Sequence, residues 1–426
     1  MSSRYKPVSE LRSGQDPSNR NTAPVNRSVY MDANATTALL PEVFEAMSPY
    51  LLGQCGNASS GHRHGRQARA SLETARQQVA YLFNCHVAEV IFTSGGTEAD
   101  NLAIFGAVTE PGAHIVTSSI EHHAVLHAVK SLEQKGCQAT YLPVEASGRV
   151  SPDEVLGALR PNTRLISIML ANNETGVLQP VEAISRIARE RGVLFHTDAV
   201  QAAGKASIDV EQIGCDLLSI SGHKMNGPQG TGALFVRSGV KLEPMFHGGT
   251  QELSRRAGTE NVVGIVGFGE AAVLAKNSLK DGSLKKLAKL RDALENSVLL
   301  EVEEAGVNGS RNERVPNTTN IWFGGIDGSA LLKNLDQMGV SVSGGSACNA
   351  GACEPSHVLM AMGLTPSRAS RSIRFSLSKQ TTPEDVDFAI WQVAEAIAKL
   401  RGMRTASQSV HNGQRRPRDI AGPERA

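Results

Sequence analysis

The chain is poor in aromatic residues, lacks long hydrophobic runs and carries almost no net charge. Phe, Trp and Tyr make up 4% of its 426 residues, and the formal net charge is +1. A near-neutral chain gives no electrostatic reason to expect a nucleic-acid or membrane surface. No apolar run approaches the roughly 20 residues that are needed to cross a bilayer. We therefore expect neither a nucleic acid nor a membrane as a partner.

Cysteine is also scarce, and the six cysteines are scattered along the chain as Cys55, Cys85, Cys137, Cys215, Cys348 and Cys353. Secreted disulfide scaffolds have a much denser spacing, so a reducing compartment is expected. The first 28 residues lack the apolar segment of a secretory signal. We expect a cytoplasmic protein, with an organelle as the alternative because the leader also contains several arginines.

The length indicates two or three domain-sized units with cores large enough to fold without crosslinks. Residues 1–27 and 403–426 are polar and short of large apolar side chains, which predicts disordered tails. Between the tails we expect a large domain over residues 40–280. A smaller domain is expected from residues 281–402 together with the N-terminal segment 28–39.

Short β-branched runs alternate with helical patterns in the large domain. Strands are predicted at EVIFTS, HIVTSS, RLISIML, VLFHTD, DLLSIS and GALFVR, and helices at segments such as 97–108, 123–136 and 180–192. This alternation predicts an α/β fold with a largely parallel sheet covered by helices on both faces. From residue 284 onward, a long helix to residue 306 is followed by mixed elements and a last helix to residue 402, which indicates an α+β domain.

Polar motifs follow five of the predicted strands where each strand ends. They are SGGT, EHH, NNETG, the Asp198 that closes VLFHTD, and SGHK. In open α/β sheets, ligands bind in the crevice beyond the carboxyl ends of the strands. Five reactive-looking strand ends in one sheet therefore predict one shared pocket.

Lys224, in SGHK, gives the strongest single signal. A lysine just past a buried strand loses part of its hydration, which lowers the pKa of its amine and frees it for Schiff-base chemistry. Taken alone, a solvated surface lysine is the more frequent case. Asp198 changes this balance, because a carboxylate there can keep a pyridine nitrogen protonated and make a pyridoxal ring an electron sink. Asp198 would also cap a following helix, and the two roles are compatible.

Gly95, Gly96 and Thr97 lie where a helix is predicted to begin. Free backbone N–H groups, the helix dipole and the Thr97 hydroxyl would receive a phosphate there, although the same residues also form an ordinary turn. GGTEADN does not match the dinucleotide fingerprint, which weakens a nicotinamide alternative. His122 and His123 are adjacent and cannot face one metal ion from a helix, so a ring stacked on a cofactor is favoured over zinc.

Cys348 lies in GVSVSGGSACNAGACEPSHVL, whose small residues predict a mobile loop with an exposed thiol. Attack of a thiolate on sulfur needs such a cysteine. A disulfide with Cys353 or half of a metal site are alternatives, but no second Cys or His pair accompanies them at zinc spacing. Arg374, in RSIRFSL, suits the carboxylate of an amino-acid substrate, with a structural salt bridge as the equal alternative.

Taken together, these motifs resemble the cysteine desulfurases of the NifS and IscS type, which are class V members of the fold-type I pyridoxal-phosphate enzymes. The likeness runs from about Tyr30 to about Arg401 and includes, in order, MDANATT, GNASSGHRHGRQA, FTSGGTEADNLAI, EHHAV, NNETGVLQPV, HTDAVQAAGK, SGHKMNGPQGTGAL, RAGTENV, GGSAC and SIRFSL. It implies a mostly parallel seven-stranded sheet plus a smaller α+β domain, pyridoxal 5'-phosphate as cofactor, and a homodimer that converts L-cysteine to L-alanine. The alternatives are another class V enzyme, such as a selenocysteine lyase, and a non-catalytic platform of the same fold.

The resemblance also implies a role for each motif residue. Lys224 would bond the cofactor and move protons, His122 would stack on its ring, and Cys348 would take the substrate sulfur as a persulfide. Further cofactor contacts would come from Gly96, Thr97, Asn173, Asp198, Gln201, Ser221, His223 and, from the neighbouring subunit, Thr259. Asn34 and Arg374 would hold the substrate carboxylate. The sulfur would pass to a scaffold for iron–sulfur cluster assembly or to a thiolation pathway, and Cys348 would contact a nascent cluster only transiently, without a stable metal site.

Overall fold

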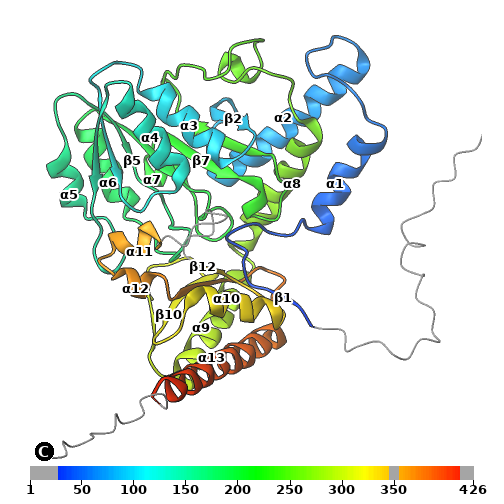
Figure 1. Ribbon diagram of the computed structural model, residues 1–426. Coiled ribbons are helices and arrows are strands. Elements are labelled where there is room, and N and C mark those ends of the chain that lie inside the picture. Colours follow the sequence, from blue (N-terminus) through cyan, green and yellow to red (C-terminus); the bar gives the residue numbers. More distant parts are fainter. Residues whose placement is uncertain (1–26, 345–354, 413–426) are drawn as a thin grey trace, which may run out of the picture.

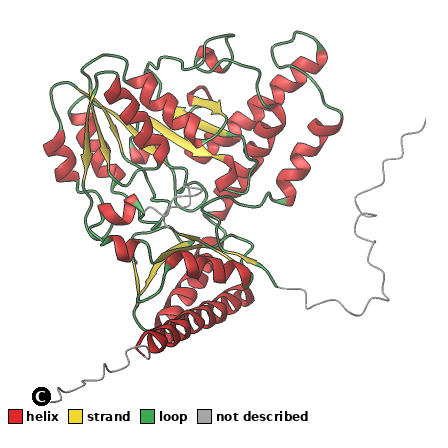
Figure 2. Cartoon of the chain, viewed as in Figure 1, coloured by secondary structure: helices red, strands yellow, loops and turns green. Residues whose placement is uncertain are grey.

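A computed structural model describes residues 27–344 and 355–412. Cys348 and Cys353 lie outside the described residues, as do residues 1–26 and 413–426 of the two predicted tails. The described chain forms a larger α/β body and a smaller body of helices against a short sheet, which lie one above the other in Figure 1 and are coloured by secondary structure in Figure 2.

The larger body is built on a seven-stranded sheet in the order β2-β8-β7-β6-β5-β3-β4. Its strands are β2 (Val90–Thr93), β3 (His114–Ser118), β4 (Gln138–Leu142), β5 (Thr163–Ser167), β6 (Leu194–Asp198), β7 (Leu217–Ser221) and β8 (Gly232–Val236). β8 runs antiparallel to both of its neighbours, and the remaining pairs are parallel. The predicted fold class is thus confirmed. β4 was not predicted, because this edge strand is only partly buried and lacks a continuous apolar run.

Helices cover both faces of this sheet because adjacent strand residues point to opposite sides. Ile91, Ile115 and Leu165 belong to a core with the helices α3 (Gly96–Ala107) and α4 (His123–Gln134). Their neighbours along the strands belong to a second core on the other face. That second face is covered by α2 (Arg63–Phe83), α6 (Val181–Glu190) and α8 (Val262–Ser278), while α1 (Pro41–Leu52) packs on α8 and the shorter α5 (Pro152–Ala158) and α7 (Val210–Ile213) complete the body.

The smaller body contains an antiparallel sheet in the order β12-β13-β10-β9. The strands are β9 (Ala305–Val307), β10 (Thr318–Phe323), β12 (Ser343–Gly344) and β13 (Ser372–Ser376), and the helices are α9 (Ser283–Glu301), α10 (Gly328–Gln337), α11 (His357–Ala361), α12 (Pro366–Ala369) and α13 (Pro383–Asn412). The N-terminal strand β1 (Val29–Tyr30) pairs with β11 (Val340–Ser341), and Val29 and Met31 are buried in this smaller core.

Two helix ends differ from the sequence prediction. α9 ends at Glu301, short of residue 306, because the chain turns there into β9, which pairs with β10. α13 runs on to Asn412 and so enters the stretch predicted as a disordered tail.

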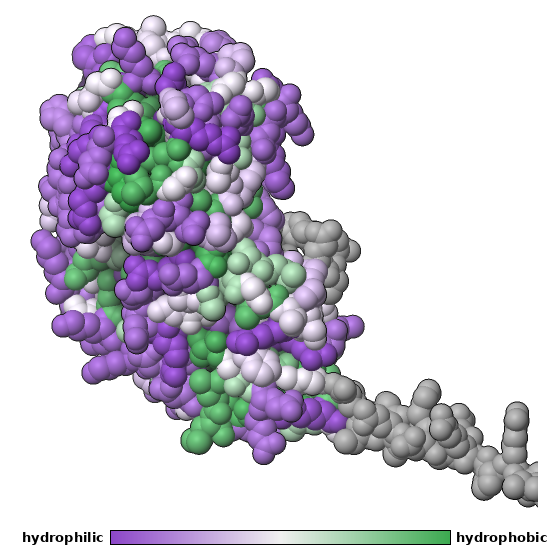
Figure 3. All heavy atoms as spheres, turned by 90° about the vertical axis from the view of Figure 1, so that its left-hand side faces the viewer, coloured by the Kyte–Doolittle hydropathy of each residue, from purple (hydrophilic) through white to green (hydrophobic). Residues whose placement is uncertain are grey.

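Within residues 27–344 and 355–412, no single helix is long and apolar enough to span a membrane, although α8 and α9, bent by 76° at their junction, would pass together by length and composition. On the face shown in Figure 3, hydrophilic side chains cover much of the surface and hydrophobic ones form separate patches.

Candidate active site

A cavity of about 320 Å³ lies at the carboxyl ends of the parallel strands. It is lined by Asn34, Ala35, Gly96, Thr97, Asp100, His122, Met169, Asn173, Asp198, Val200, Gln201, Ser221, His223, Lys224 and Arg374. All five strand-end motifs contribute, since they follow β2, β3, β5, β6 and β7, whose carboxyl ends share one edge of the sheet. The structure therefore brings together every predicted site residue except Cys348 and Thr259.

Lys224 ends a short turn of 3-10 helix, η3 (Gly222–Lys224), that follows β7 directly. Its Nζ donates to the backbone oxygens of Asn34 at 2.6 Å and Ala35 at 2.7 Å. Gly222 is required here, because an added Cβ would lie 2.5 Å from Thr231 Oγ1. The tight strand-to-turn junction thus places the amine at the cavity.

Asp198 is a buried carboxylate at the end of β6. Its Oδ1 accepts the backbone N–H of Val200 at 2.9 Å, so it also caps the turn that follows. Burial raises the pKa of Asp198 to about 6, while the Val200 N–H and the Lys224 charge act in the opposite direction. Asp100 lies beside it, and burial together with the Asp198 charge raises the pKa of Asp100 well above its usual value. Asp100 is therefore the neutral partner, and Asp198 is the one suited to face a cationic ring nitrogen.

His122 precedes α4, and its Nδ1 accepts the backbone N–H of Ala124 at 3.2 Å. Burial, followed by the Lys224 charge, lowers the pKa of His122 to about 4. The ring is therefore neutral at pH 7, with its proton on Nε2. His123 points elsewhere and stacks on His127 and His357, with ring centroids 5.0 and 4.8 Å apart. The parts of the chain that the structure describes contain no group of three metal-ligating side chains.

The N-terminal turn of α3 forms one end of the cavity. The first N–H groups of a helix have no acceptor within the helix, so those near Gly96 and Thr97 suit a phosphate. A Cβ on Gly96 would lie 2.7 Å from Val200 Cγ2, so only glycine leaves the space beside this turn open. His223 contacts Thr36 Oγ1 at 3.0 Å through Nδ1, and burial lowers its pKa to about 4.

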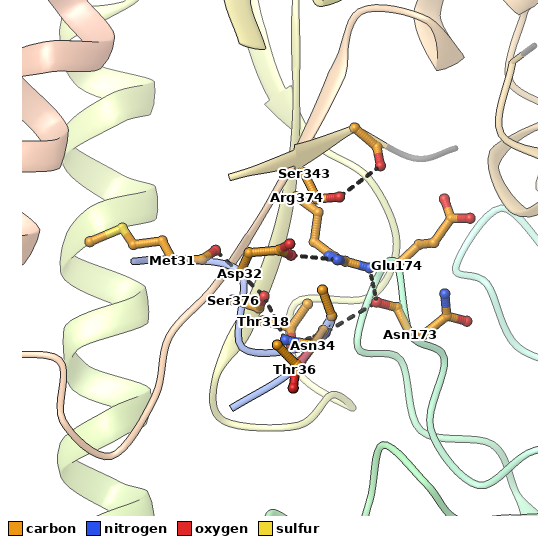
Figure 4. A network of polar contacts seen from close by, with 12 residues as sticks. Met31, Asp32, Asn34, Thr36, Asn173, Glu174, Thr318, Ser343, Arg374 and Ser376 are labelled. Atoms are coloured by element: carbon orange, nitrogen blue, oxygen red, sulfur yellow. Dashed lines mark hydrogen bonds and ion pairs between the residues drawn. The ribbon is translucent and has the colours of Figure 1, made fainter. Parts of the chain in front are cut away.

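Arg374 on β13 brings a guanidinium from the smaller body to the cavity lining, where it lies among Asp32, Asn34 and Asn173 (Figure 4). It donates to Asp32 Oδ1 at 2.6 Å and to the backbone oxygen of Asn173 at 3.0 Å. Both Arg374 Nε and Asn173 Oδ1 are buried and have no hydrogen-bond partner among the described residues. Buried polar atoms of this kind normally have a partner, so these two are available to a bound ligand.

Asn34 lines the same cavity, but its amide is already engaged. Its Nδ2 donates to the Asn173 backbone oxygen at 3.1 Å and to Thr318 Oγ1 at 2.9 Å. Arg374 is therefore better placed than Asn34 to hold a substrate carboxylate. Gln201 donates from Nε2 to the Asn34 backbone oxygen at 3.0 Å, and its Oε1 accepts from the Lys205 amine at 2.9 Å.

Several residues of this site were not predicted from the sequence, namely Asp32, Asp100, Met169, Val200 and Lys205. Asp32 lies within the motif MDANATT and Lys205 within HTDAVQAAGK, so membership of these motifs could have pointed to both residues. Lys205 also follows Gln201 by four residues, a spacing at which two side chains of a helical turn lie close together. Thr259 is exposed and does not line the cavity, and Cys348 lies outside the described residues.

Residues 29–388 match the sequence profile of the family described as aminotransferase class-V. The chain belongs to this family. Among its relatives is a protein named cysteine desulfurase IscS from Dictyoglomus turgidum, 47% identical over 380 residues, which are 88% of this chain and 96% of the relative. A solved structure titled NifS-like protein is 36% identical with a TM-score of 0.82, covering 88% of this chain and all of that one. Another, titled SspA in complex with cysteine, is 36% identical with a TM-score of 0.74, covering 83% and 99%.

Class V membership supports the predicted pyridoxal-phosphate cofactor, and the relatives named cysteine desulfurase, together with that membership, support the predicted enzyme class. The side chains fit the cofactor. The α3 turn and the open space beside Gly96 suit its phosphate, buried Asp198 suits its ring nitrogen, and the unpartnered Asn173 Oδ1 suits a polar substituent. When bound, pyridoxal phosphate withdraws electrons from the α-carbon of an attached amino acid.

Proposed function

We propose that the cavity removes sulfur from L-cysteine, with Lys224 and Asp198 holding the cofactor and Cys348 receiving the sulfur. One observation carries this proposal: a half-buried amine, a buried carboxylate, a helix N-terminus and an arginine surround one cavity of about 320 Å³. The amine and carboxylate come from neighbouring strand ends of the larger body, and the arginine comes from the smaller body. A cofactor and an amino acid would both have charged partners there.

Three groups orient the reactants. Asp198 stays ionised opposite a cationic ring nitrogen, because neutral Asp100 takes the proton of the carboxyl pair. Neutral His122 offers a flat face for stacking and an Nε2 proton for transfer. Lys224, held by two carbonyl oxygens, is the amine that binds the cofactor and moves a proton between substrate carbons.

Arg374 would hold the carboxylate of L-cysteine. The likeness to SspA, whose structure contains cysteine, supports this substrate. Arg374 is buried, and its two terminal nitrogens donate to Asp32 and Asn173. These hydrogen bonds fix the orientation of the guanidinium group and therefore the direction of its unpartnered Nε–H. A preorganised arginine loses little side-chain entropy when it binds a carboxylate.

The sulfur would leave on Cys348. Its thiolate attacks the substrate sulfur, the carbon–sulfur bond breaks with its electron pair remaining on carbon, and protonation of that carbon gives L-alanine. Cys348 is left as a persulfide, whose outer sulfur passes to an acceptor thiol. We propose a scaffold for iron–sulfur cluster assembly or a thiolation pathway as the acceptor.

We also propose a homodimer in a reducing compartment, the cytoplasm or an organelle. Thr259 is exposed, and the large side chains of Phe44, Leu52, Phe246 and Leu253 are 47–88% exposed, which a second copy would cover. The four cysteines in the described ranges, Cys55, Cys85, Cys137 and Cys215, are free thiols, as a reducing compartment requires. Light scattering on the purified protein measures the oligomeric state, and a monomer would contradict the dimer.

Turnover of L-cysteine tests the catalytic assignment. Alanine and sulfide are measured with a reductant for the wild type, Lys224→Ala, Cys348→Ala and the control Lys241→Ala, which changes an exposed lysine. We expect the Lys241 variant to match the wild type, and the Lys224 variant to lose both the visible absorbance of bound cofactor and all turnover. Turnover of the Lys224 variant at the wild-type rate would refute the mechanism. Full alanine production by the Cys348 variant would refute sulfur transfer through this thiol. A selenocysteine lyase is expected to give that result.

A further inference from the structure

We infer that Lys205 is a positioning residue, whose amine fixes the amides of Asn34 and Gln201 and so sets the carboxylate-binding end of the cavity. The inference deepens the proposed function, on which it rests. Lys205 has no part in the cofactor or sulfur chemistry described above, yet its amine lies among residues that line the same cavity.

The contacts of Lys205 join two cavity-lining side chains. Its Nζ donates to Gln201 Oε1 at 2.9 Å and to Asn34 Oδ1 at 3.3 Å. The protonated lysine amine has donors only, so in that form both amide oxygens face it. The Gln201 nitrogen is thereby turned to the Asn34 backbone oxygen, which also accepts from Lys224. One amine thus decides the orientation of two amides.

The effect reaches Arg374 through Asn34. With its oxygen turned to Lys205 and to Asn317 Nδ2, Asn34 directs its own Nδ2 to the backbone oxygen of Asn173. That oxygen also accepts from Arg374. Lys205 therefore stabilises the arrangement that leaves Arg374 Nε and Asn173 Oδ1 open to a ligand.

Lys205 also contributes charge where the substrate carboxylate is expected. Burial, together with the charges of Lys224 and Arg374, lowers the pKa of Lys205 to about 7. Three basic groups crowded at one end of a buried cavity repel one another, and a carboxylate that enters relieves this repulsion. An apolar side chain in place of Lys205 removes the hydrogen bonds to the amide oxygens of Asn34 and Gln201. It also removes part of the attraction for a carboxylate.

The experiment compares Lys205→Met, which keeps the length without the donors, with Lys205→Arg, which keeps donors and charge. We measure kcat and KM for L-cysteine, the visible absorbance of bound cofactor, and the dissociation constant of L-alanine from its effect on that absorbance. For Lys205→Met we expect the cofactor to be retained, and KM and the alanine dissociation constant to rise about tenfold or more, as for loss of a charge-assisted hydrogen bond. Lys205→Arg should recover part of this loss.

A role in folding alone would reduce the fraction of active enzyme and hence apparent kcat, while KM stayed unchanged. Wild-type KM and alanine affinity in the Lys205→Met variant would therefore overturn the inference. Should this variant not fold, Lys205→Gln, which removes the charge and is too short to hold both amide oxygens, tests the inference in its place. Wild-type KM and wild-type alanine affinity in Lys205→Gln would refute it. The outcome is separate from that of the proposed function, which fails only if Lys224→Ala or Cys348→Ala retains turnover.

Discussion

Glu121 ties the active-site segment before His122 to the neighbouring strand end, and we predict that it controls how stability depends on pH. Its carboxyl group is fully buried, contacts Ser118 Oγ at 2.5 Å and accepts the Met169 N–H at 3.0 and 3.1 Å. Burial raises its pKa to about 8, against the opposing effect of these hydrogen bonds. The folded protein therefore holds Glu121 protonated at pH 7. Glu121→Gln replaces this neutral acid by a neutral amide of similar shape.

The sign and size follow from proton linkage. The unfolded chain ionises Glu121 near pH 4.5, and the folded chain ionises it near pH 8. Between these values the unfolded state binds fewer protons, so stability contributed by the acid is complete below pH 4.5 and is lost as pH rises through 8. Each pH unit is worth about 1.4 kcal/mol, so the wild type should lose up to about 4 kcal/mol relative to Glu121→Gln between pH 5 and pH 9.

Urea denaturation at pH 5, 7 and 9, with saturating cofactor, measures this difference. The comparison of wild type with Glu121→Gln cancels other titrating groups, such as the buried Glu174, whose pKa is also raised by burial. Glu154→Gln serves as the control, because Glu154 is exposed on α5. Parallel stability curves for the wild type and Glu121→Gln over this pH range would refute the protonated buried acid.

Three further substitutions test the site and its support. Gly96→Ala should weaken pyridoxal-phosphate binding about tenfold or more in an absorbance titration, because the new Cβ would lie 2.7 Å from Val200 Cγ2, and an unchanged Kd would contradict this. Arg374→Lys should raise KM for L-cysteine about tenfold in steady-state assays, since one amine cannot reproduce the guanidinium contacts; a wild-type KM would contradict a substrate role. Arg76→Met should cost about 3–5 kcal/mol of unfolding free energy because it leaves the buried Glu252 carboxylate without its counter-ion, and Arg76→Met/Glu252→Gln should recover much of this loss. If the double variant does not recover stability, the loss arises from packing around Arg76 and not from the unneutralised carboxylate.

The local pattern of apolar runs was enough to predict the main strands and their helices. Strands such as β5 and β7 are buried on both faces, and such strands read as short continuous apolar runs. β4 was not predicted because an edge strand needs fewer apolar side chains, so it lacks the continuous apolar run used to predict the others. The end of α9 and the extension of α13 were also not predicted, since helix ends depend on tertiary contacts that a helical pattern does not contain.

The residues that line the cavity were predicted from the sequence where chemistry follows a strand end. Lys224, Asp198, His122 and Thr97 were found because the carboxyl ends of parallel strands converge, and this rule needs only the order of strands. The strand-end rule does not predict Lys205, because its proposed role depends on its contacts with the two amide oxygens of Asn34 and Gln201. It does not reach Asp100 either, which lies inside α3 and matters only because it is buried beside Asp198.

Short motifs were enough to predict the fold class, the cofactor and most residues that line the cavity, because the geometry of such motifs is local. The distribution of charge over those residues depends on tertiary packing. Burial sets which of Asp100 and Asp198 holds a proton and keeps His122 neutral. Packing of the smaller body brings Arg374 to the backbone oxygen of Asn173. Such effects depend on desolvation and on contacts between residues far apart in the chain, which no local pattern records.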